Sequence, residues 1–447
     1  MQLKKRDRSV QSALMAASCA LIGATAVRAD ATSDGSEGDW QADSALLYYK
    51  EDQGRVQAIE PVVSLAKDFG DEHVLGLKFT YDSLSGGSPN GALPSHLAQT
   101  FATPSGTSLQ APAGGTQTYT TSSGREVAEL EHVTLYTVQP GGIPLDPNFH
   151  DQRIAFNIGW QQPLGDGSKV SVGADASHEM DFLSVGVNAA LAHDFNNRNT
   201  TVSFGGNFEA DSIQPIGGVP LAGSDYVLLE KGGKESKRVA GALLGVTQVF
   251  SRRWLAQLNF SFDSSQGYQT DPYKILSVID TGGNAVGYRF ESRPRSRARQ
   301  SAYLENKIAI GRDVLDVALR YMKDDWGIRS QTAEIRYRFE FANGAYLEPH
   351  ARYYKQTAAD FYTLYADAAN PLPEFMSADP RLSRFKGTTF GVKFGWPLSD
   401  GSEFSLRVEQ YRQNAQDVPA AFGALQGLDL APGLKSVMAQ IGFRYRF

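Results

Sequence analysis

The sequence predicts an all-β protein, a transmembrane antiparallel β-barrel of about sixteen strands, and three observations lead to this fold class. Apolar and polar side chains alternate with a period of two in segments of about 10–13 residues, the length of a tilted strand that crosses a bilayer. Aromatic residues stand at the ends of the apolar faces, where girdles at a membrane–water interface belong. The connections alternate between very short and very long, which is typical of short periplasmic turns and long extracellular loops.

The composition excludes several other classes of protein. A mean hydropathy of -0.32 is too polar for a bundle of membrane-spanning helices, and no run of about 18 uncharged apolar residues is present. A hydrophobic content of 41% is too high for a disordered chain. The net charge of -6 argues against nucleic acid as a partner, because surfaces that bind it need an excess of Lys and Arg. A soluble β-sandwich also alternates, but the strand lengths, aromatic girdles and connections favour the membrane barrel.

The N-terminus has the features of an export signal in the expected order. A basic stretch over 4–8 precedes an apolar stretch over 13–26, and the small residue Ala29 ends the segment. We therefore expect residues 1–29 to be a signal peptide, cleaved after Ala29 once the chain has crossed the inner membrane. The single cysteine, Cys19, leaves with it, so we expect neither a disulfide nor a thiolate metal site in the mature chain.

After cleavage, we expect residues 30–43 to form a periplasmic N-terminal segment and residues 44–447 to form the barrel. The predicted strands are approximately 44–51, 55–66, 72–83, 150–164, 168–178, 181–195, 200–212, 238–250, 254–268, 299–311, 314–324, 329–341, 345–356, 387–398, 403–412 and 436–447. An even number returns both ends of the barrel to the periplasmic side. If residues 44–66 lie inside the lumen instead, the barrel has fourteen strands.

The last strand shows the alternation most clearly. Val437, Ala439 and Ile441 occupy one parity, and Gln440 and Arg444 occupy the other. In a closed barrel every backbone N–H and C=O is paired around the ring, so only the outward face has to be apolar. The chain ends on an aromatic residue, and we expect the barrel assembly machinery to bind the C-terminal Phe447.

Short connections are expected on the periplasmic side and long ones outside. The short ones are at 165–167, 196–199, 251–253, 312–313, 343–344 and 399–402, and the long ones span roughly 84–149, 213–237, 269–298, 358–386 and 414–435. The longest connection, 84–149, is rich in Ser, Thr, Gly and Pro, and we expect it to be a mobile surface loop.

Five segments on the loop side carry a resemblance to a known family. They are Asp82 to Ala92 (DSLSGGSPNGA), Asp271 to Lys274 (DPYK), Glu291 to Arg297 (ESRPRSR), Asp324 to Ile328 (DDWGI) and Ala358 to Tyr362 (AADFY). In these segments the chain resembles a family of Gram-negative outer-membrane barrels known only as a bacterial domain of unknown function. The resemblance covers nearly the whole mature chain and implies the barrel fold, but no activity. Exported flavin-attachment and thioredoxin-like proteins occur beside members of this family, which implies a redox partner.

Four arginines stand at alternate positions near the predicted outer mouth, namely Arg293, Arg295, Arg297 and Arg299. The alternation places them on the lumen side, where a ladder of guanidinium groups would attract anions or phosphate groups. Two alternatives are structural pairing with acidic residues of neighbouring strands and contact with lipopolysaccharide phosphates outside.

A second group of charged residues is predicted to line the lumen on two strands joined by the turn at 343–344. We select Arg336, Arg338, Glu340 and Arg352 as candidates for selectivity, the alternative being a solvated wall of cross-strand pairs.

The mouth turn with Asp324 and Asp325 offers two carboxylates that suit Ca²⁺, but adjacent acids are also ordinary turn residues, and we predict no metal site.

The predicted function is a porin-like channel for small hydrophilic solutes, because a barrel of this size normally encloses an aqueous channel. The main alternative is a scaffold in the outer membrane that houses or exports a periplasmic or lumenal protein partner, such as an extracytoplasmic redox carrier. The third possible function is that of a barrel hydrolase. However, the seven histidines are scattered and no nucleophile–base pair can be assigned, so we expect that the protein is not an enzyme. We expect contacts with membrane lipid and lipopolysaccharide, and no cofactor.

Overall fold

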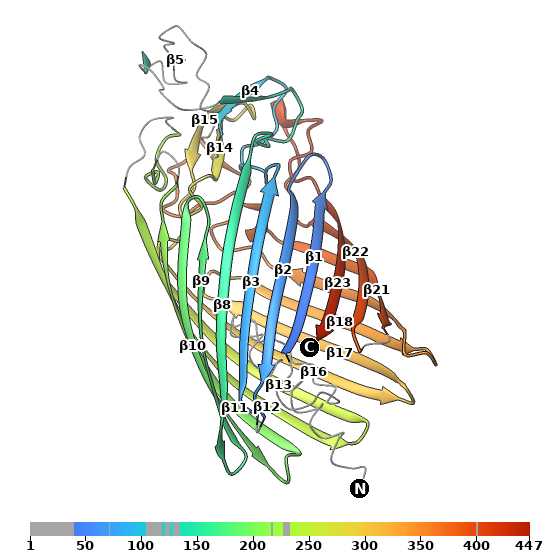
Figure 1. The fold of residues 1–447 in the computed structure, drawn as a ribbon. Helices are drawn as coiled ribbons and strands as arrows, with labels where there is room; N and C mark the ends of the chain where they lie inside the picture. Colours follow the sequence, from blue (N-terminus) through green and yellow to red (C-terminus); the bar gives the residue numbers. More distant parts are fainter. Residues whose placement is uncertain are drawn as a thin grey trace, which may run out of the picture.

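The computed structural model describes residues 40–70, 72–103, 119–120, 126–127, 135–215, 218–226, 233–398 and 401–447. Sixteen of its antiparallel strands form a closed barrel, in which β1 pairs with both β2 and β23 (Figure 1). In order around the wall they are β1 (Trp40–Glu51), β2 (Gln57–Asp68), β3 (Val74–Ser85), β8 (His150–Gly165), β9 (Ser168–His178), β10 (Phe182–Phe195), β11 (Thr200–Ile213), β12 (Glu235–Ser251), β13 (Trp254–Gly267), β16 (Ser296–Ile310), β17 (Asp313–Asp324), β18 (Arg329–Glu340), β19 (Tyr346–Gln356), β21 (Phe385–Pro397), β22 (Glu403–Ala415) and β23 (Leu434–Arg446). In the described part of the chain no helix is long and apolar enough to cross a membrane.

The predicted count of sixteen strands is confirmed, and so is the place of the first hairpin. Trp40–Glu51 pairs in continuous register with β2 on one side and with β23 on the other, so residues 44–66 lie in the wall. The alternative of fourteen strands is therefore wrong. β1 also begins at Trp40 rather than at residue 44, so the end of the segment predicted to precede the barrel is part of its first strand. The predicted signal peptide and its cleavage site lie outside the described residues.

The two faces of the wall differ as the alternation predicts. On β10, Leu183, Val185 and Val187 point outward and are 42%, 50% and 55% exposed, while Gly186 and Asn188 face the lumen. The same outward apolar row recurs on the other strands of the barrel. Because the backbone groups are paired around the ring, these apolar faces can contact lipid while the opposite faces stay polar.

Glycines on the inner face of β21 let the neighbouring side chains lie flat against the wall. Gly387, Gly391 and Gly395 stand four residues apart on this face. A Cβ atom on Gly395 would lie 2.1 Å from the ring of Tyr346, and one on Gly391 would lie 2.4 Å from Cγ of Glu409. Side chains from β19 and β22 thus cross over β21, which any larger residue at these positions would prevent.

One end of the barrel, here called the turn end, carries the short connections, both described chain ends and a belt of aromatic side chains. Trp254, Trp396 and Tyr445 are 42%, 50% and 40% exposed there. Trp254 stacks on Phe250 at 4.2 Å between ring centroids. This belt confirms the aromatic girdle predicted for the apolar faces, at the depth where amphipathic rings suit a membrane–water interface.

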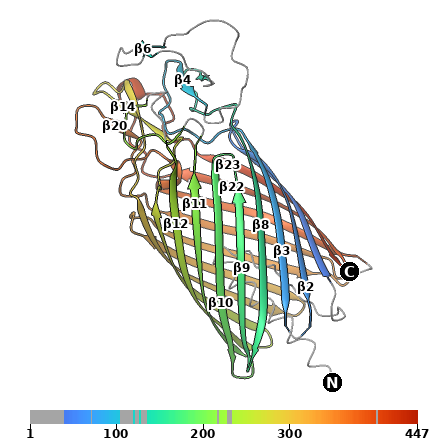
Figure 2. The same ribbon diagram turned by 60° about the vertical axis from the view of Figure 1, so that its left-hand side comes forward.

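The opposite end, the loop end, is covered by a folded layer that we call the cap (Figures 1 and 2). Its sheet has the order β15 (Ala285–Phe290), β14 (Ile275–Ile279), β20 (Tyr365–Asp367), and beside it β4 (Gln99–Ala102) pairs with β7 (Leu135–Val138). The 3₁₀ turns η1 (Pro380–Leu382) and η2 (Gly423–Leu425) complete it. A short pair, β5 (Tyr119–Thr120) with β6 (Glu126–Val127), belongs to the same long connection as β4 and β7.

The connection 84–149, which is predicted to be a mobile surface loop, is folded at both of its flanks. Phe101 of β4 is 1% exposed and Leu93 is 3% exposed, and Phe101 packs against Tyr136 of β7 and Tyr288 of β15. Most of the residues between 103 and 135 lie outside the described part of the chain. The composition of the connection suggested mobility, but a few well-spaced apolar residues are enough to fix its two ends on the cap.

The glycine row gives a test of the wall packing. We expect Gly395→Val to destabilise the barrel by about 1–3 kcal/mol, because its side chain would overlap the Tyr346 ring. Gly159→Val is the matched control, since Gly159 also faces the lumen from a strand, but a Cβ atom added there would meet only one neighbouring atom, at 3.9 Å. The midpoint of thermal unfolding, followed by the gel shift of the folded barrel, measures the difference. Equal midpoints for the two variants would contradict this account.

Candidate functional site

The cap is held together by an apolar layer around β14. All five residues of this strand are buried, with Leu276 at 0% and Ile275 at 2% exposure. Leu276 and Val278 pack against Met376 and Ala378, which come from the connection between β19 and β21. On its other face the strand joins a cluster that includes Phe101 and Phe290. Burial of this kind gives the cap a hydrophobic core of its own, separate from the lipid-facing wall.

Next to this layer lies a buried network of alternating charges that we call the ionic cluster. It consists of Asp271, Lys274, Glu291, Arg293, Asp379 and Arg381. The Arg293 guanidinium lies 2.7 Å from Glu291 and 2.8 Å from Asp379, and Arg381 lies 2.6 Å from Asp379 and 2.7 Å from Asp271. Glu291 is 0% and Asp379 is 1% exposed. Three acids and three bases balance, which is what so deep a burial of charge requires.

The ionic cluster ties three of the family-like segments together. Lys274 donates from Nζ to Oγ of Ser88 at 2.7 Å and also to the carbonyl oxygen of Pro89. Burial lowers the pKa of Lys274. Burial alone would raise the pKa of Asp379, but Arg381 and Arg293 outweigh it and hold the pKa of that carboxyl well below its usual range. The hydrogen bonds of Lys274 and the ion pairs of Asp379 thus fix these loops to one another.

The four predicted ladder arginines have four different environments. Arg293 is locked in the ionic cluster, before the strand begins. Arg295 is exposed and pairs with Glu235 at 2.8 Å. Arg297 pairs with Asp324 at 2.6 Å and lies over the ring of Trp326 at 4.4 Å. Arg299 faces the lumen and is exposed, with no ion pair to any described residue. Three of the four thus pair with carboxylates, which is the first alternative considered for them, and their charges do not form a continuous ladder.

The mouth turn uses its two carboxylates to hold the backbone. Asp324 accepts hydrogen bonds from the backbone N–H of Trp326 at 3.1 Å and of Ile328 at 2.8 Å, besides its two bonds from Arg297. Asp325 accepts from the N–H of Ala298 at 3.0 Å. The oxygens of Asp324 are therefore already engaged, and this geometry does not resemble an open cation site.

On the wall, one of the predicted lumen residues, Arg336, belongs to a belt of charged contacts that run along and across the strands. His350 lies 3.2 Å from Glu334 and 3.0 Å from Glu409, which it reaches over Gly391 of the strand between them. Arg336 pairs with Glu334, and Arg407 lies 3.5 Å from Glu409. The alternative of a wall of cross-strand pairs thus describes this part of the lumen.

The other wall candidates differ in whether their charged groups contact neighbouring residues. Arg338 lies over the Tyr346 ring at 3.6 Å, and Glu340 lies at the turn end, where its backbone N–H donates to Asp313. Arg352 is exposed and forms no ion pair with a described residue. Arg320 on β17 is equally exposed and shares the parity of the lumen-facing Asp316. The sequence analysis missed Arg320, although its parity on the strand marks it as inward.

A group of three acids at the loop end was also missed. One carboxylate oxygen each from Asp151, Glu179 and Asp181 lies within 4.8 Å of the other two, and the Tyr273 hydroxyl donates to Asp181. Burial, and after it the charge of Asp151, raises the pKa of Glu179 to about 7. The three residues come from the start of β8 and the turn between β9 and β10, so only the strand register brings them together.

The two neighbouring arginines at the mouth allow a direct test of the ionic cluster. Arg293→Ala leaves Glu291 and Asp379 buried without their partner, and we expect it to loosen the cap by about 3–5 kcal/mol. Arg295→Ala removes only an exposed pair, which is worth at most about 1 kcal/mol. Limited proteolysis of the folded barrel measures the opening of the cap. Equal protease sensitivity of the two variants would show that the network does not hold the loops.

The acid group predicts a dependence on pH. Because the pKa of Glu179 is raised to about 7 in the folded turn, its protonated form stabilises this turn. That stabilisation is complete at acidic pH, below the ordinary Glu pKa, and is lost as the pH rises through about 7. We expect hydrogen exchange of the turn amides, corrected for the intrinsic rate, to be several-fold faster at about pH 8 than at about pH 5.

Glu179→Gln should remove this difference, while Asp225→Asn, a change of an exposed acid in a neighbouring loop, should keep it. A pH difference that persists in Glu179→Gln would assign the effect to another group.

The chain was compared with known proteins by sequence and by structure. No curated protein matches the sequence. Among solved structures, the chain is similar to the outer membrane protein OpdK of Pseudomonas aeruginosa, with 9% identity, a TM-score of 0.39 and coverage of 92% of this chain and 99% of the other. OccAB1 of Acinetobacter baumannii matches with 10% identity and a TM-score of 0.34, over 92% and 96% of the two chains.

A mutant of the ferric enterobactin receptor PfeA of Pseudomonas aeruginosa, in complex with enterobactin, matches with 9% identity and a TM-score of 0.40. The match covers 85% of this chain and 54% of the receptor, so the chain spans about half of the receptor's length. At these identities the likeness concerns the fold alone. The sequence itself matches a family described as "Protein of unknown function (DUF3570)" over residues 11–445, and the chain belongs to this family.

Proposed function

We propose that the protein is a passive, porin-like channel of the outer membrane for small hydrophilic solutes, and that it is exported with a cleaved signal peptide. The observation that carries this proposal is the exposure of Arg299, Arg320 and Arg352. All three share the parity of lumen-facing partners on their strands, so their exposure means that water reaches the inner wall. A solid barrel core would have to bury and pair such charges.

The arrangement of charge supports a role in selectivity for these arginines. They lie on β16, β17 and β19, on the same part of the wall as Arg336 and Arg338. Asp175, Glu209 and Asp263 face the lumen from β9, β11 and β13. Charged rings and patches of this kind tune which ions enter a pore. The lumen candidates for selectivity are therefore Arg299, Arg320 and Arg352, which replace the paired arginines of the mouth.

Conductance of the refolded barrel in a planar bilayer tests both parts of the proposal. We expect stable channels, and we expect the double variant Arg320→Glu with Arg352→Glu to raise the permeability ratio of cations to anions several-fold in a salt gradient. Arg238→Glu is the control, because Arg238 is exposed on the outward face of β12 and its replacement makes the same change of charge per residue outside the lumen. If the reversal potential is the same in the double variant as in the unchanged protein, the role of these arginines in selectivity is overturned.

A second function is favoured by one observation, the cap itself. A simple sieve does not need a packed layer with its own hydrophobic core and ionic cluster across the loop end. The alternative proposal is a scaffold that houses or exports a protein partner, such as a redox carrier. A folded barrel that gives no conductance, and that copurifies with a lumenal or periplasmic protein from native membranes, would favour this function over the channel.

A further inference from the structure

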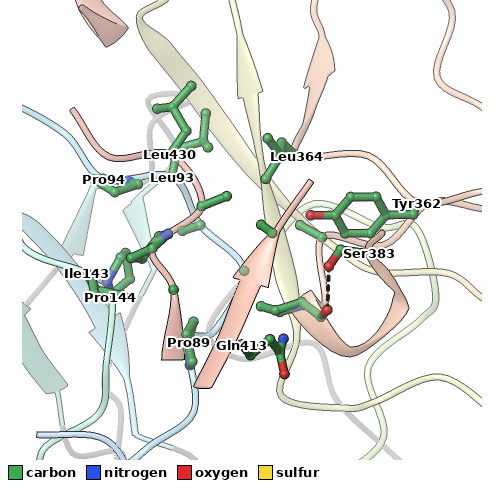
Figure 3. A pocket seen from close by; sticks show the side chains of 18 of the residues that line it. Pro89, Leu93, Pro94, Ile143, Pro144, Tyr362, Leu364, Ser383, Gln413 and Leu430 are labelled. Carbon is green, nitrogen blue, oxygen red and sulfur yellow. Dashed lines mark hydrogen bonds between the residues drawn. The ribbon is translucent and has the colours of Figure 1, made fainter. Parts of the chain in front are cut away.

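The loop end contains a pocket between the cap and the upper end of β22. The empty space inside it is about 630 Å³, a figure that includes open solvent at its mouth. Figure 3 shows Leu93, Pro94 and Ile143 on one side of the pocket, and Tyr362 and Leu364 on the other. Leu430 completes the apolar part of the lining, and Tyr362 and Ser383 add neutral hydroxyl groups to it. Such a wall suits a compact apolar body of a ligand.

One cation, Arg55, lines the same pocket. It lies in the connection between β1 and β2 and is only 8% exposed. Its Nη2 donates to the carbonyl oxygen of Pro432 at 3.3 Å, and its buried Nε has no hydrogen-bond partner. No carboxylate of the described residues forms an ion pair with it, although Arg293 and Arg297 in the same part of the molecule both have one. A buried guanidinium of this kind is costly unless an anion comes to it.

A second donor lines the pocket near the top of β22. The side-chain oxygen of Gln413 accepts a hydrogen bond from the Tyr411 hydroxyl at 2.9 Å, which leaves the amide NH₂ group of Gln413 to donate. The pocket therefore combines a guanidinium and an amide donor with an apolar wall. Carboxylate oxygens are the acceptors that such donors suit best.

The surroundings of Arg55 restrict the charge of the ligand. Glu51, Asp52 and Asp429 act on Arg55 through space, beyond ion-pair distance. These three acids would repel a dianion such as phosphate or a dicarboxylate more strongly than a monoanion. The apolar wall further disfavours a small, strongly hydrated ion, which would gain nothing from it.

We propose that this pocket is a binding site for a small organic monocarboxylate with a compact apolar body, whose carboxylate pairs with Arg55. The site goes beyond the proposed channel function and does not depend on it, because binding in the cap requires no passage through the lumen.

Binding of benzoate to the refolded barrel in detergent micelles tests the proposal. Saturation-transfer NMR and calorimetric titration should detect benzoate, and should show at least tenfold weaker binding of neutral benzamide and of inorganic phosphate. Arg55→Gln should weaken benzoate binding at least tenfold. Arg384→Gln is the matched control, since Arg384 is an exposed cap arginine outside the pocket that pairs with Asp417, and its affinity should equal that of the unchanged protein.

A second variant tests the pocket without touching the guanidinium. Ala431→Phe places a ring in the pocket from its apolar side and should displace benzoate while Arg55 stays in place. Equal affinity for benzoate and benzamide, or full affinity in Arg55→Gln or Ala431→Phe, would overturn the proposal. Because the readout is binding, its failure is distinct from a failure of the channel, which only conductance reports.

Discussion

A strand that lies in hydrocarbon cannot leave its backbone N–H and C=O groups without partners, since each such group costs several kcal/mol there. The pairing of β1 with β23 meets this requirement, because it turns a sheet with two open edges into a ring with none. The outward rows of Leu, Val and Phe then only have to match the lipid, and the inward rows are free to carry charge. The inner face can therefore hold both the glycine row of β21 and the charged belt around His350.

Much of the wall was predictable from the sequence, because the side chains of a strand alternate between its two faces and this period of two is visible in the order of apolar and polar residues. The spacing of Val437, Ala439 and Ile441 alone indicates that they lie on one face of a strand, whichever strand is its neighbour. The cap was not predictable in the same way. Phe101 and Ile275 belong to short segments with no long alternation, and nothing in their local sequence indicates that they meet. The sequence therefore indicated the barrel and left the fold of its longest loop open.

For the candidate sites, too, the sequence predicted which face of a strand a residue occupies but not which residues it contacts. The parity of Arg336 and Arg352 placed them on the lumen side correctly, but the contacts of His350 with Glu334 and Glu409 depend on which strand lies next and in which register. The equal spacing of Arg293, Arg295 and Arg297 suggested one common role, yet the strand begins only at Ser296, and the residues before it turn into the cap. Asp151 and Glu179 lie far apart in the local pattern and meet only through the register of β8 and β9.

The bond between Lys274 and Ser88 joins two residues that are 186 positions apart in the chain. Between them in the sequence lie six strands of the wall, β8 to β13. Contacts of such high sequence separation form late, because the entropy of closing the loop must be overcome first. The same holds for Arg55 and Pro432, which meet across the seam between the first and last strands. The closing of the wall, in which β1 pairs with β23, and the assembly of the cap therefore both depend on contacts between segments that are far apart in the chain.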